Sequence, residues 1–243
     1  MEKQTVVPYK ESELGKKEQV AQMFDNIAHR YDLLNRVLSL GIDKIWRYRA
    51  INQLKDIKPK TILDVATGTA DVALAAMRLK PRKIMGIDIS EEMIAIGREK
   101  IAKKKLNHII HLQKADAENL PFENNSFDAI TVAFGVRNFE NLEKGLAELR
   151  RVLKEDGKLV VLEFSQPKAF PVKQLFGFYS TYILPQIGKM VSSDSSAYTY
   201  LPESVKAFPE GNAFLDILHS QGFKSTKWIS LSFGISAIYT AQK

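Results

Sequence analysis

The sequence contains no cysteine in its 243 residues, which excludes disulfide bonds, thiolate catalysis and zinc sites built on cysteine. It has no uninterrupted apolar run near the ~18 residues of a membrane-spanning helix. The polar N-terminal segment, residues 1–17, lacks the apolar core of a signal peptide. Walker A, Gly-x-Ser-x-Gly and His-Glu-x-x-His patterns are missing as well. We therefore expect a cytoplasmic protein with no metal site.

The composition is that of an ordinary globular protein with a basic charge balance. Hydrophobic residues make up 45% of the chain and charged residues 26%, so the chain can bury a full core. Its length fits one large domain or one domain with an insertion. The net charge of +7 admits nucleic acid or an anionic membrane surface. The lysine cluster at residues 100–105 has no interleaved aromatics for stacking on bases, so we expect no nucleic-acid partner and leave a weak attraction to anionic lipid open.

The rest of the chain is arranged around residues 62–71. An apolar run ends in Asp64, passes through small residues and enters a helical pattern, which indicates a buried parallel strand, a tight turn and a helix N-terminus. Gly68 lets the backbone turn sharply, and the helix start favours an anionic group. A second apolar run ends in Asp88, 24 positions after Asp64. An acid at that place usually binds ribose hydroxyls, so this stretch predicts a nucleotide-type cofactor site.

The turn narrows the class of cofactor. The dinucleotide fingerprint requires glycine at three places, and this chain has Ala66, Gly68 and Ala70 there. A pyrophosphate cradle is therefore weakly supported, whereas Asp64 suits a ligand with an amino group, such as the amino-acid end of S-adenosylmethionine. The plain alternative is an ordinary small-residue turn in an open α/β domain. The placement of Asp88 favours the cofactor site.

Apolar runs alternate with helical patterns through the middle of the chain, which predicts a parallel sheet with right-handed crossovers. After the first two strands, further strands are expected at residues 109–113, 127–134 and 158–164, and helices after Asp88 and over residues 141–153. Ligands of such sheets bind outside the carboxyl ends of the strands. We expect Asp64, Asp88, Asp116 and residues 134–138 to meet there.

Three segments extend this pattern. Apolar positions at helical spacing predict a helix over residues 16–40, broken near residues 32–35, and a second helix capped by Asp43. Residues 165–213 are too long for a plain connection and predict a helical cap over the substrate. This segment holds an aromatic stretch that runs to Leu184-Pro185 and a polar stretch, Ser192 to Ser196. The chain closes with a helix over residues 213–221 and an antiparallel pair of strands, 224–232 and 235–241.

We therefore expect one domain over residues 1–243. Its parts are an N-terminal arm with helices (1–57), a cofactor-binding core (58–164 and 214–243) and a cap insertion (165–213).

The segment 134–138, Phe-Gly-Val-Arg-Asn, follows the fourth strand. A glycine followed by a positive charge and an amide would place hydrogen-bond donors over the cofactor crevice. The alternative is a helix-capping turn with a surface arginine. Its position at the mouth of a central strand favours the functional interpretation.

Blocks that span the chain from about residue 20 onward together resemble the menaquinone/ubiquinone biosynthesis C-methyltransferase family. They are Tyr31 to Gly41 with Trp46-Arg47, Asp64 to Thr69, Phe134 to Asn138, Arg151 to Lys154 with Leu162 to Ser165, and Tyr198 to Ser204. The resemblance implies a three-layer, Rossmann-like class I fold that uses S-adenosylmethionine to methylate a prenylated quinol, with demethylmenaquinol as the favoured substrate. By matching motif it also implies that Thr67, Asp88, Asp116 and Ala117 contact the cofactor, beside the predicted Asp64 and Gly68. Two positions depart from the family: many relatives have His at Asp43, and some have Ser at Ala133.

An oxidised quinone would not attack a methyl sulfonium, but a reduced quinol, as its phenolate, is nucleophilic at carbon. We expect Arg137 and Asn138 to hold the phenolate oxygen, with Tyr31 and Tyr200 lining the ring pocket. The aromatic stretch in residues 170–184 would receive the isoprenoid tail, which implies peripheral contact with a membrane surface.

Alternatives to this function stay open. They are a benzoquinol substrate from ubiquinone biosynthesis, a nicotinamide-dependent reductase, a nucleic-acid methyltransferase and a lipid-binding protein without catalysis. The oligomeric state is also open, with a homodimer among the alternatives.

Overall fold

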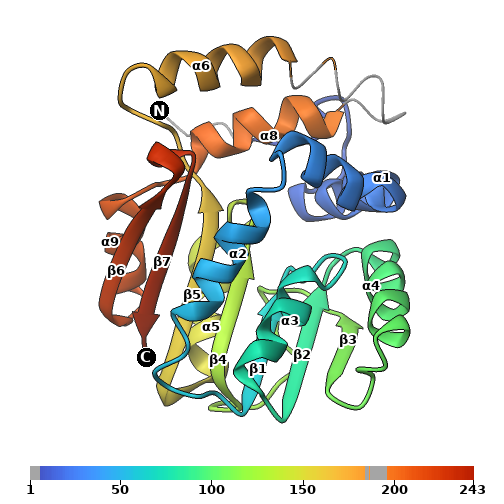
Figure 1. Cartoon of the computed structure of the whole chain (residues 1–243), viewed down its shortest axis with the longest axis vertical. Coiled ribbons are helices and arrows are strands. Elements are labelled where there is room, and N and C mark those ends of the chain that lie inside the picture. Colours follow the sequence, from blue (N-terminus) through green and yellow to red (C-terminus); the bar gives the residue numbers. More distant parts are fainter. Residues whose placement is uncertain (1–5, 184–185, 187–195) are drawn as a thin grey trace.

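The computed structural model describes residues 6–183, 186 and 196–243. Its centre is a seven-stranded sheet with the strand order β3-β2-β1-β4-β5-β7-β6 (Figure 1). The first five strands run parallel, and β7 is antiparallel to both of its neighbours, β5 and β6. The predicted parallel sheet with a terminal antiparallel hairpin is confirmed. The strands are β1 Thr61–Val65, β2 Lys83–Asp88, β3 Ile110–Lys114, β4 Phe127–Ala133, β5 Leu153–Phe164, β6 Lys224–Leu231 and β7 Ser236–Gln242.

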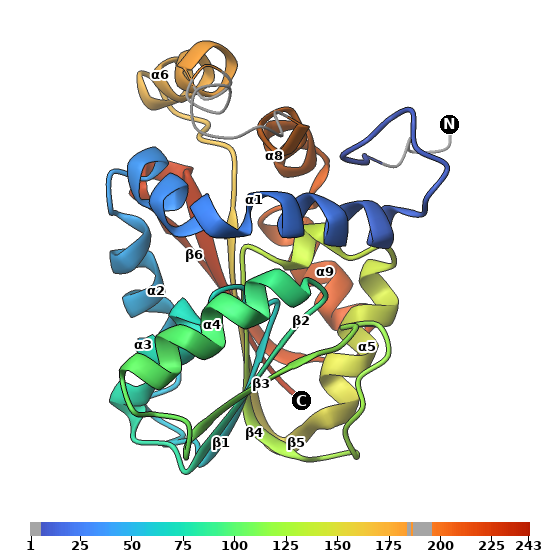
Figure 2. The ribbon, with the colours of Figure 1, turned by 90° about the vertical axis from the view of Figure 1, so that its right-hand side faces the viewer.

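Helices cover both faces of the sheet, which gives three layers. Figure 2 views the sheet nearly edge-on, with α2, α3 and α4 on one side and α5 and α9 on the other. The helices are α1 Lys16–Leu38, α2 Asp43–Asn52, α3 Asp71–Ala76, α4 Glu91–Lys103, α5 Leu142–Val152, α6 Val172–Phe178, α8 Ser196–Ala207 and α9 Asn212–Ser220. Shorter helical turns are η1 Met77–Leu79, η2 Val136–Asn138, η3 Tyr179–Ile183 and η4 Ser232–Gly234.

The apolar runs form strands because both of their faces are buried. In β5, Leu159 and Val161 pack in the core under α5 and α9, while Val160 and Leu162 pack in the core under α2 and α3. Strands buried on both faces have continuous apolar runs rather than alternating ones. The order of the sheet reverses between β1 and β4, which is where a doubly wound sheet opens a crevice for ligands.

The helix α1 crosses the carboxyl ends of the parallel strands (Figure 2). It runs without interruption from Lys16 to Leu38, so the predicted break near residues 32–35 is wrong. The reason is tertiary: the carboxylate of Asp32 accepts hydrogen bonds from Thr69 Oγ1 at 2.6 Å and from Lys100 Nζ at 2.8 Å, which ties this part of the helix to the core.

The helix α2 begins at Asp43, and its N-cap is Ile42 without a side-chain cap. The prediction that Asp43 caps the helix is therefore wrong. Its carboxylate instead accepts a hydrogen bond from Ser39 Oγ at 2.7 Å and pairs with Arg47 at 2.7 Å. A buried aspartate between these two partners connects the end of α1 to the start of α2.

The insertion between β5 and α9 is helical, as predicted, but its helices differ in packing. Tyr198 and Tyr200 of α8 are buried against α1. In contrast, α6 has no buried residue and lies at the edge of the molecule (Figure 1). The predictions for Leu184-Pro185 and for residues 192–195 lie outside the described residues.

Candidate cofactor and substrate site

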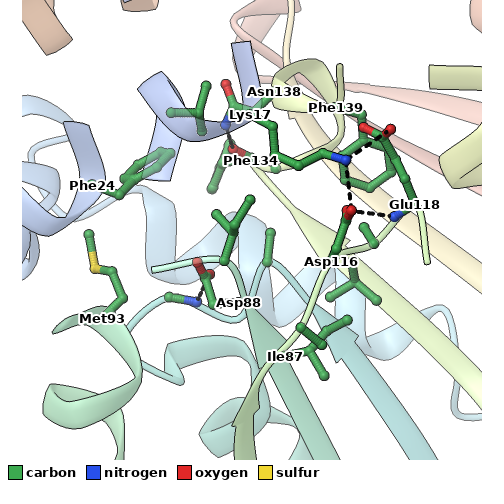
Figure 3. A pocket seen from close by; sticks show the side chains of 18 of the residues that line it. Lys17, Phe24, Ile87, Asp88, Met93, Asp116, Glu118, Phe134, Asn138 and Phe139 are labelled. Atoms are coloured by element: carbon green, nitrogen blue, oxygen red, sulfur yellow. Dashed lines mark hydrogen bonds and ion pairs between the residues drawn. The ribbon is translucent and has the colours of Figure 1, made fainter. Parts of the chain in front are cut away.

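A pocket lies at the carboxyl ends of β1, β2 and β4, under α1 (Figure 3). Its empty volume is about 700 Å³ with the open mouth included. Six of the ten predicted site residues line it: Tyr31, Gly68, Asp88, Asp116, Ala117 and Asn138. The other four, Asp64, Thr67, Arg137 and Tyr200, do not line it.

The turn after β1 brings the main chain close to the pocket. Ala66, Gly68 and Ala70 all have left-handed backbone angles, with φ of 53°, 53° and 67°. A Cβ added to Gly68 would meet only the Tyr31 ring, 3.9 Å away, so it would project into the pocket. A Cβ on Gly135 would lie 2.4 Å from the Ala66 Cβ, which shows how closely the two turns pack. The alanines at the fingerprint positions therefore adopt the turn without glycine.

Asp88 ends β2 at the floor of the pocket (Figure 3). Its carboxylate accepts hydrogen bonds from the N–H groups of Gly68 at 2.8 Å and Ser90 at 3.0 Å. Burial raises the pKa of Asp88 despite these hydrogen bonds. The side chain thus fixes the turn after β1 and presents an acid to the pocket, as expected for a group that binds ribose hydroxyls.

Asp116 follows β3 and is held by a lysine from α1. Its Oδ2 lies 2.7 Å from Lys17 Nζ, and its Oδ1 accepts the N–H of Glu118 at 2.9 Å. Lys17 also lies 3.4 Å from Glu118 Oε2. Burial lowers the pKa of Lys17, but the hydrogen bonds and charges of Asp116 and Glu118 outweigh it and raise the pKa overall. In Figure 3 this lysine reaches across the pocket to both acids.

Asp64 lies beneath the pocket and not in its wall. Its two carboxylate oxygens accept hydrogen bonds from Thr67 and Thr131, each at 2.6 Å. Burial raises the pKa of Asp64 to about 6. The carboxylate braces the turn after β1 against β4, and Thr67 serves as one of its two donors. Direct contact of Asp64 or Thr67 with a cofactor stays a prediction.

Within residues 134–138, Asn138 lines the pocket, whereas Arg137 forms a buried ion pair. Arg137 Nη1 lies 2.8 Å from Glu163 Oε1, and the two side chains are 7% and 0% exposed. The same arginine donates through Nε to Ser204 Oγ of α8 at 3.3 Å. Asn138 faces the pocket and accepts a hydrogen bond from Tyr200 Oη at 3.1 Å.

The two predicted tyrosines differ in position. Tyr31 lines the pocket and packs edge-on against Phe24, with ring centroids 6.0 Å apart. Tyr200 is 2% exposed and touches the pocket through Asn138. Burial raises the pKa of Tyr31 and raises that of Tyr200 to about 12. Both therefore stay protonated near neutral pH and can donate hydrogen bonds.

Lys17, Phe139 and Glu163 belong to this site but were not predicted from the sequence. Lys17 meets Asp116 across 99 positions, and Glu163 meets Arg137 across 26. An acid at the end of the fifth strand was the one signal that could have indicated Glu163, because that strand end faces the same crevice.

The doubly wound sheet, with acids after its second and third strands and a hairpin after the parallel strands, has the fold of class I methyltransferases. The solved structure of a SAM-dependent methyltransferase from Thermotoga maritima has this fold, with a TM-score of 0.63 at 18% identity over 92% of this chain and 99% of that one. The model of the ubiE/COQ5 methyltransferase family matches residues 12–243. The chain belongs to this family, and its cofactor is S-adenosylmethionine.

Two relatives of known name match nearly the whole chain. A protein of Bacteroides fragilis, named demethylmenaquinone methyltransferase, is 52% identical over 98% of this chain and 97% of its own length. A protein of Geotalea daltonii, named ubiquinone/menaquinone biosynthesis C-methyltransferase UbiE, is 46% identical over 94% of this chain and 97% of its own length.

Proposed function

We propose that this protein transfers the methyl group of S-adenosylmethionine to a ring carbon of demethylmenaquinol, a prenylated naphthoquinol, in menaquinone biosynthesis. The observation that carries the proposal is a single pocket in which acids at two strand ends face an apolar, aromatic wall. The wall residues are Val20, Phe24, Tyr31, Met93, Phe134 and Phe139. The name of the Bacteroides fragilis relative supports the substrate, and a benzoquinol is the second candidate because the Geotalea daltonii name includes ubiquinone.

The polar end of the pocket fits the cofactor. Asp88 would accept hydrogen bonds from ribose hydroxyls, and Gly68 leaves the room that a close approach to the main chain requires. Asp116 would accept a hydrogen bond from the adenine amino group once Lys17 has moved from it. When bound, S-adenosylmethionine supplies an electrophilic methyl group on a sulfonium.

The reduced ring is the nucleophile in this reaction. Its carbon ortho to a phenolate would form the new C–C bond as the C–S bond of the bound donor breaks, and the ring proton would then leave to water. Opposite charges on sulfonium and phenolate neutralise each other along this path, so a dry pocket with fixed dipoles favours it. The apolar wall excludes water, and it holds the ring against the methyl group, which supplies much of the remaining rate.

Asn138 is the residue that we assign to the phenolate oxygen. Its Nδ2 is 3.5 Å from the Phe134 carbonyl oxygen, a weak contact for which a phenolate can compete. Tyr200 fixes the other end of the same amide. Arg137 has its guanidinium against Glu163, and its Nη1 also donates to the Phe134 carbonyl oxygen that Asn138 contacts. We therefore assign Arg137 first to positioning the segment that carries Asn138, and its direct contact with the phenolate stays a proposal to be tested.

The substrate places the reaction at a membrane surface. No helix within the described ranges is long and apolar enough to cross a bilayer, and an isoprenoid tail keeps the substrate in one. We therefore propose that the protein works in the cytoplasm in peripheral contact with a membrane.

The proposal is tested with purified protein, S-adenosylmethionine and tailless naphthoquinols or benzoquinols that lack the ring methyl group. We expect methyl transfer to the reduced naphthoquinol and none to its oxidised form. Tyr200→Phe should lower turnover and leave cofactor affinity unchanged, because it removes only the hydrogen bond to Asn138. Methylation of benzoquinols alone would contradict the proposed naphthoquinol substrate. Cofactor binding without methylation of any quinol would contradict the proposed reaction.

A further inference from the structure

Two bulky apolar side chains stand almost fully exposed at the tips of two turns. Leu40, in the turn between α1 and α2, is 93% exposed, and Phe233, in η4 at the tip of the β6–β7 hairpin, is 83% exposed. Both have left-handed backbone angles, with φ of 51° and 58°. Such positions favour Gly, Asn or Asp, and a bulky residue there is unusual. At each of these tips, both the backbone conformation and the contact of the apolar side chain with water are therefore unfavourable.

A third apolar element lies at the same end of the molecule. Both views place α6, η4 and the α1–α2 turn at the carboxyl end of the parallel strands (Figures 1 and 2). No residue of α6 is buried, although the segment around it is rich in large apolar residues. Those that are more than half exposed are Phe170, Leu175, Phe178 and Tyr182.

The hairpin tip is connected both to α6 and to the pocket. Ser165 Oγ donates to the Gly234 carbonyl oxygen at 2.7 Å, at the start of the segment that leads to α6. Trp46 Nε1 donates to Ser232 Oγ at 2.8 Å. The same tryptophan packs against Phe134 of the pocket wall, with ring centroids 6.3 Å apart.

Exposed cations lie beside Leu40 and α6 in the chain. Arg36 and Lys44 flank Leu40, and Lys173 lies within α6. Lys168, which precedes α6, is 84% exposed and pairs with Glu210 at 3.1 Å. The sequence has no acid between residues 165 and 183, and the acid nearest to Leu40, Asp43, is buried and paired with Arg47. Exposed apolar side chains with cations beside them match the boundary between anionic headgroups and acyl chains.

We propose that Leu40, Phe233 and α6, with Arg36, Lys44, Lys168 and Lys173, form a docking face for an anionic lipid bilayer. The two tips and the apolar side of α6 enter the headgroup boundary, and the four cations contact lipid phosphates. Docking at this end sets the pocket end of the sheet toward the membrane that holds a prenylated quinol. The inference rests on the proposed function in one respect, which is that a prenylated quinol lies in the membrane and the enzyme must reach the membrane to bind it.

The first test replaces both tips with asparagine. Asn adopts left-handed angles more readily than Leu or Phe, so Leu40→Asn/Phe233→Asn keeps the turns and removes the apolar surface. Flotation with vesicles of phosphatidylcholine and phosphatidylglycerol, without quinone or cofactor, should show an affinity lower by about 100-fold, or roughly tenfold per buried side chain. The melting temperature should stay equal or rise. Lost binding together with a lower melting temperature would overturn the proposal, because the tips would then be structural.

The second test changes charge at matched positions. Arg36→Glu/Lys44→Glu should lower affinity for the same vesicles by about 25-fold or more, since each lost cation is worth about fivefold. Lys104→Glu/Lys105→Glu makes the same change in net charge at exposed residues after α4, at the opposite end of the sheet, and should bind like the wild type. Vesicles of phosphatidylcholine alone should bind all of these proteins weakly.

Methylation of a tailless naphthoquinol in solution separates this proposal from the proposed function. All of the variants should retain it, because none of the changed residues lines the pocket. The docking face is wrong if the asparagine variant floats like the wild type, or if both charge variants lose binding equally. It is also wrong if the tips instead hold two copies together, as a dimer that the asparagine variant dissociates.

Discussion

The buried ion pair of Arg137 and Glu163 allows a test of what Arg137 does. Arg137→Met would leave the Glu163 carboxylate, which is 0% exposed, without its counter-charge. Breaking a buried pair in this way costs about 3–5 kcal/mol. A protein of this size loses about 2–4 °C in Tm for each kcal/mol. We therefore expect Arg137→Met to lower the Tm by about 6–20 °C.

The stability of this variant should also depend on pH. Burial already raises the pKa of Glu163 even with Arg137 beside it, so the lone carboxyl would hold its proton more tightly in the folded state than in the unfolded chain. Its contribution to stability is then fully present at low pH and is lost as pH rises through the raised pKa. Urea unfolding at several pH values, followed by circular dichroism, measures this effect.

The double variant Arg137→Met/Glu163→Gln separates stability from catalysis. Glutamine keeps an oxygen for the Phe164 N–H, which donates to Glu163 at 2.9 Å, and no buried charge remains. We expect most of the lost stability to return and cofactor affinity, measured by calorimetry, to stay near normal. Turnover should remain at least about 100-fold low, because Arg137 no longer donates to the Phe134 carbonyl oxygen, which Asn138 also contacts, and the segment that carries Asn138 loses this support.

Two results would refute this reasoning. A double variant as unstable as Arg137→Met would show that the unpaired charge is not the cause of the lost stability. A double variant that turns over like the wild type would show that Arg137 has no part in the reaction, either by contact or by positioning.

Three further substitutions test the acids of the site. The pKa of Asp64 rises from 3.8 in the unfolded chain to about 6 in the folded protein. Its contribution to stability, roughly 3 kcal/mol, is therefore present below about pH 4 and is lost as pH rises to about 6. Asp64→Asn should make the free energy of unfolding depend less on pH over that window. Asp88→Ala should raise the Kd for the cofactor more than the Kd for the quinol, which calorimetry would measure. An equal loss of both affinities would contradict the role of Asp88 in binding the cofactor. Lys17→Met frees Asp116 and should tighten cofactor binding by about fivefold, since a pair that is still partly exposed is worth up to about 1 kcal/mol. Weaker binding would mean that Lys17 itself holds the cofactor.

Much of the fold follows from local sequence. The apolar runs, the acids after them and the small-residue turn predict the strands, and Ser90 and Asn141 cap α4 and α5 through hydrogen bonds to Met93 and Lys144. The unbroken course of α1 could not be predicted, because Asp32 is held by residues that lie far from it in the chain. Local preference at Asp32 to Asn35 favours a break, and tertiary hydrogen bonds override it.

Site residues that are placed by the end of a strand could be predicted from the sequence. Those whose orientation depends on a partner side chain could not. Asp88 and Asp116 come directly after apolar runs, so topology alone brings them to the pocket. Arg137 also follows the end of a strand, but the direction of its side chain is set by the ion pair with Glu163. Nothing near Arg137 in the sequence indicates that partner. Asp64 likewise accepts hydrogen bonds from two threonines, one of them on another strand. Nothing near Asp64 in the sequence indicates the partner on β4, and its contact with the cofactor stays a prediction.

The position of β7 has a consequence for how the protein is made. Of the seven strands, β7 is synthesised last, yet it lies between β5 and β6, and six of its seven residues are buried. Until it emerges from the ribosome, β5 has an open edge and β6 has no partner, and open strand edges invite pairing with other chains. The nascent chain must therefore wait for its final strand before the sheet can close, which makes early release or slow completion a risk for aggregation.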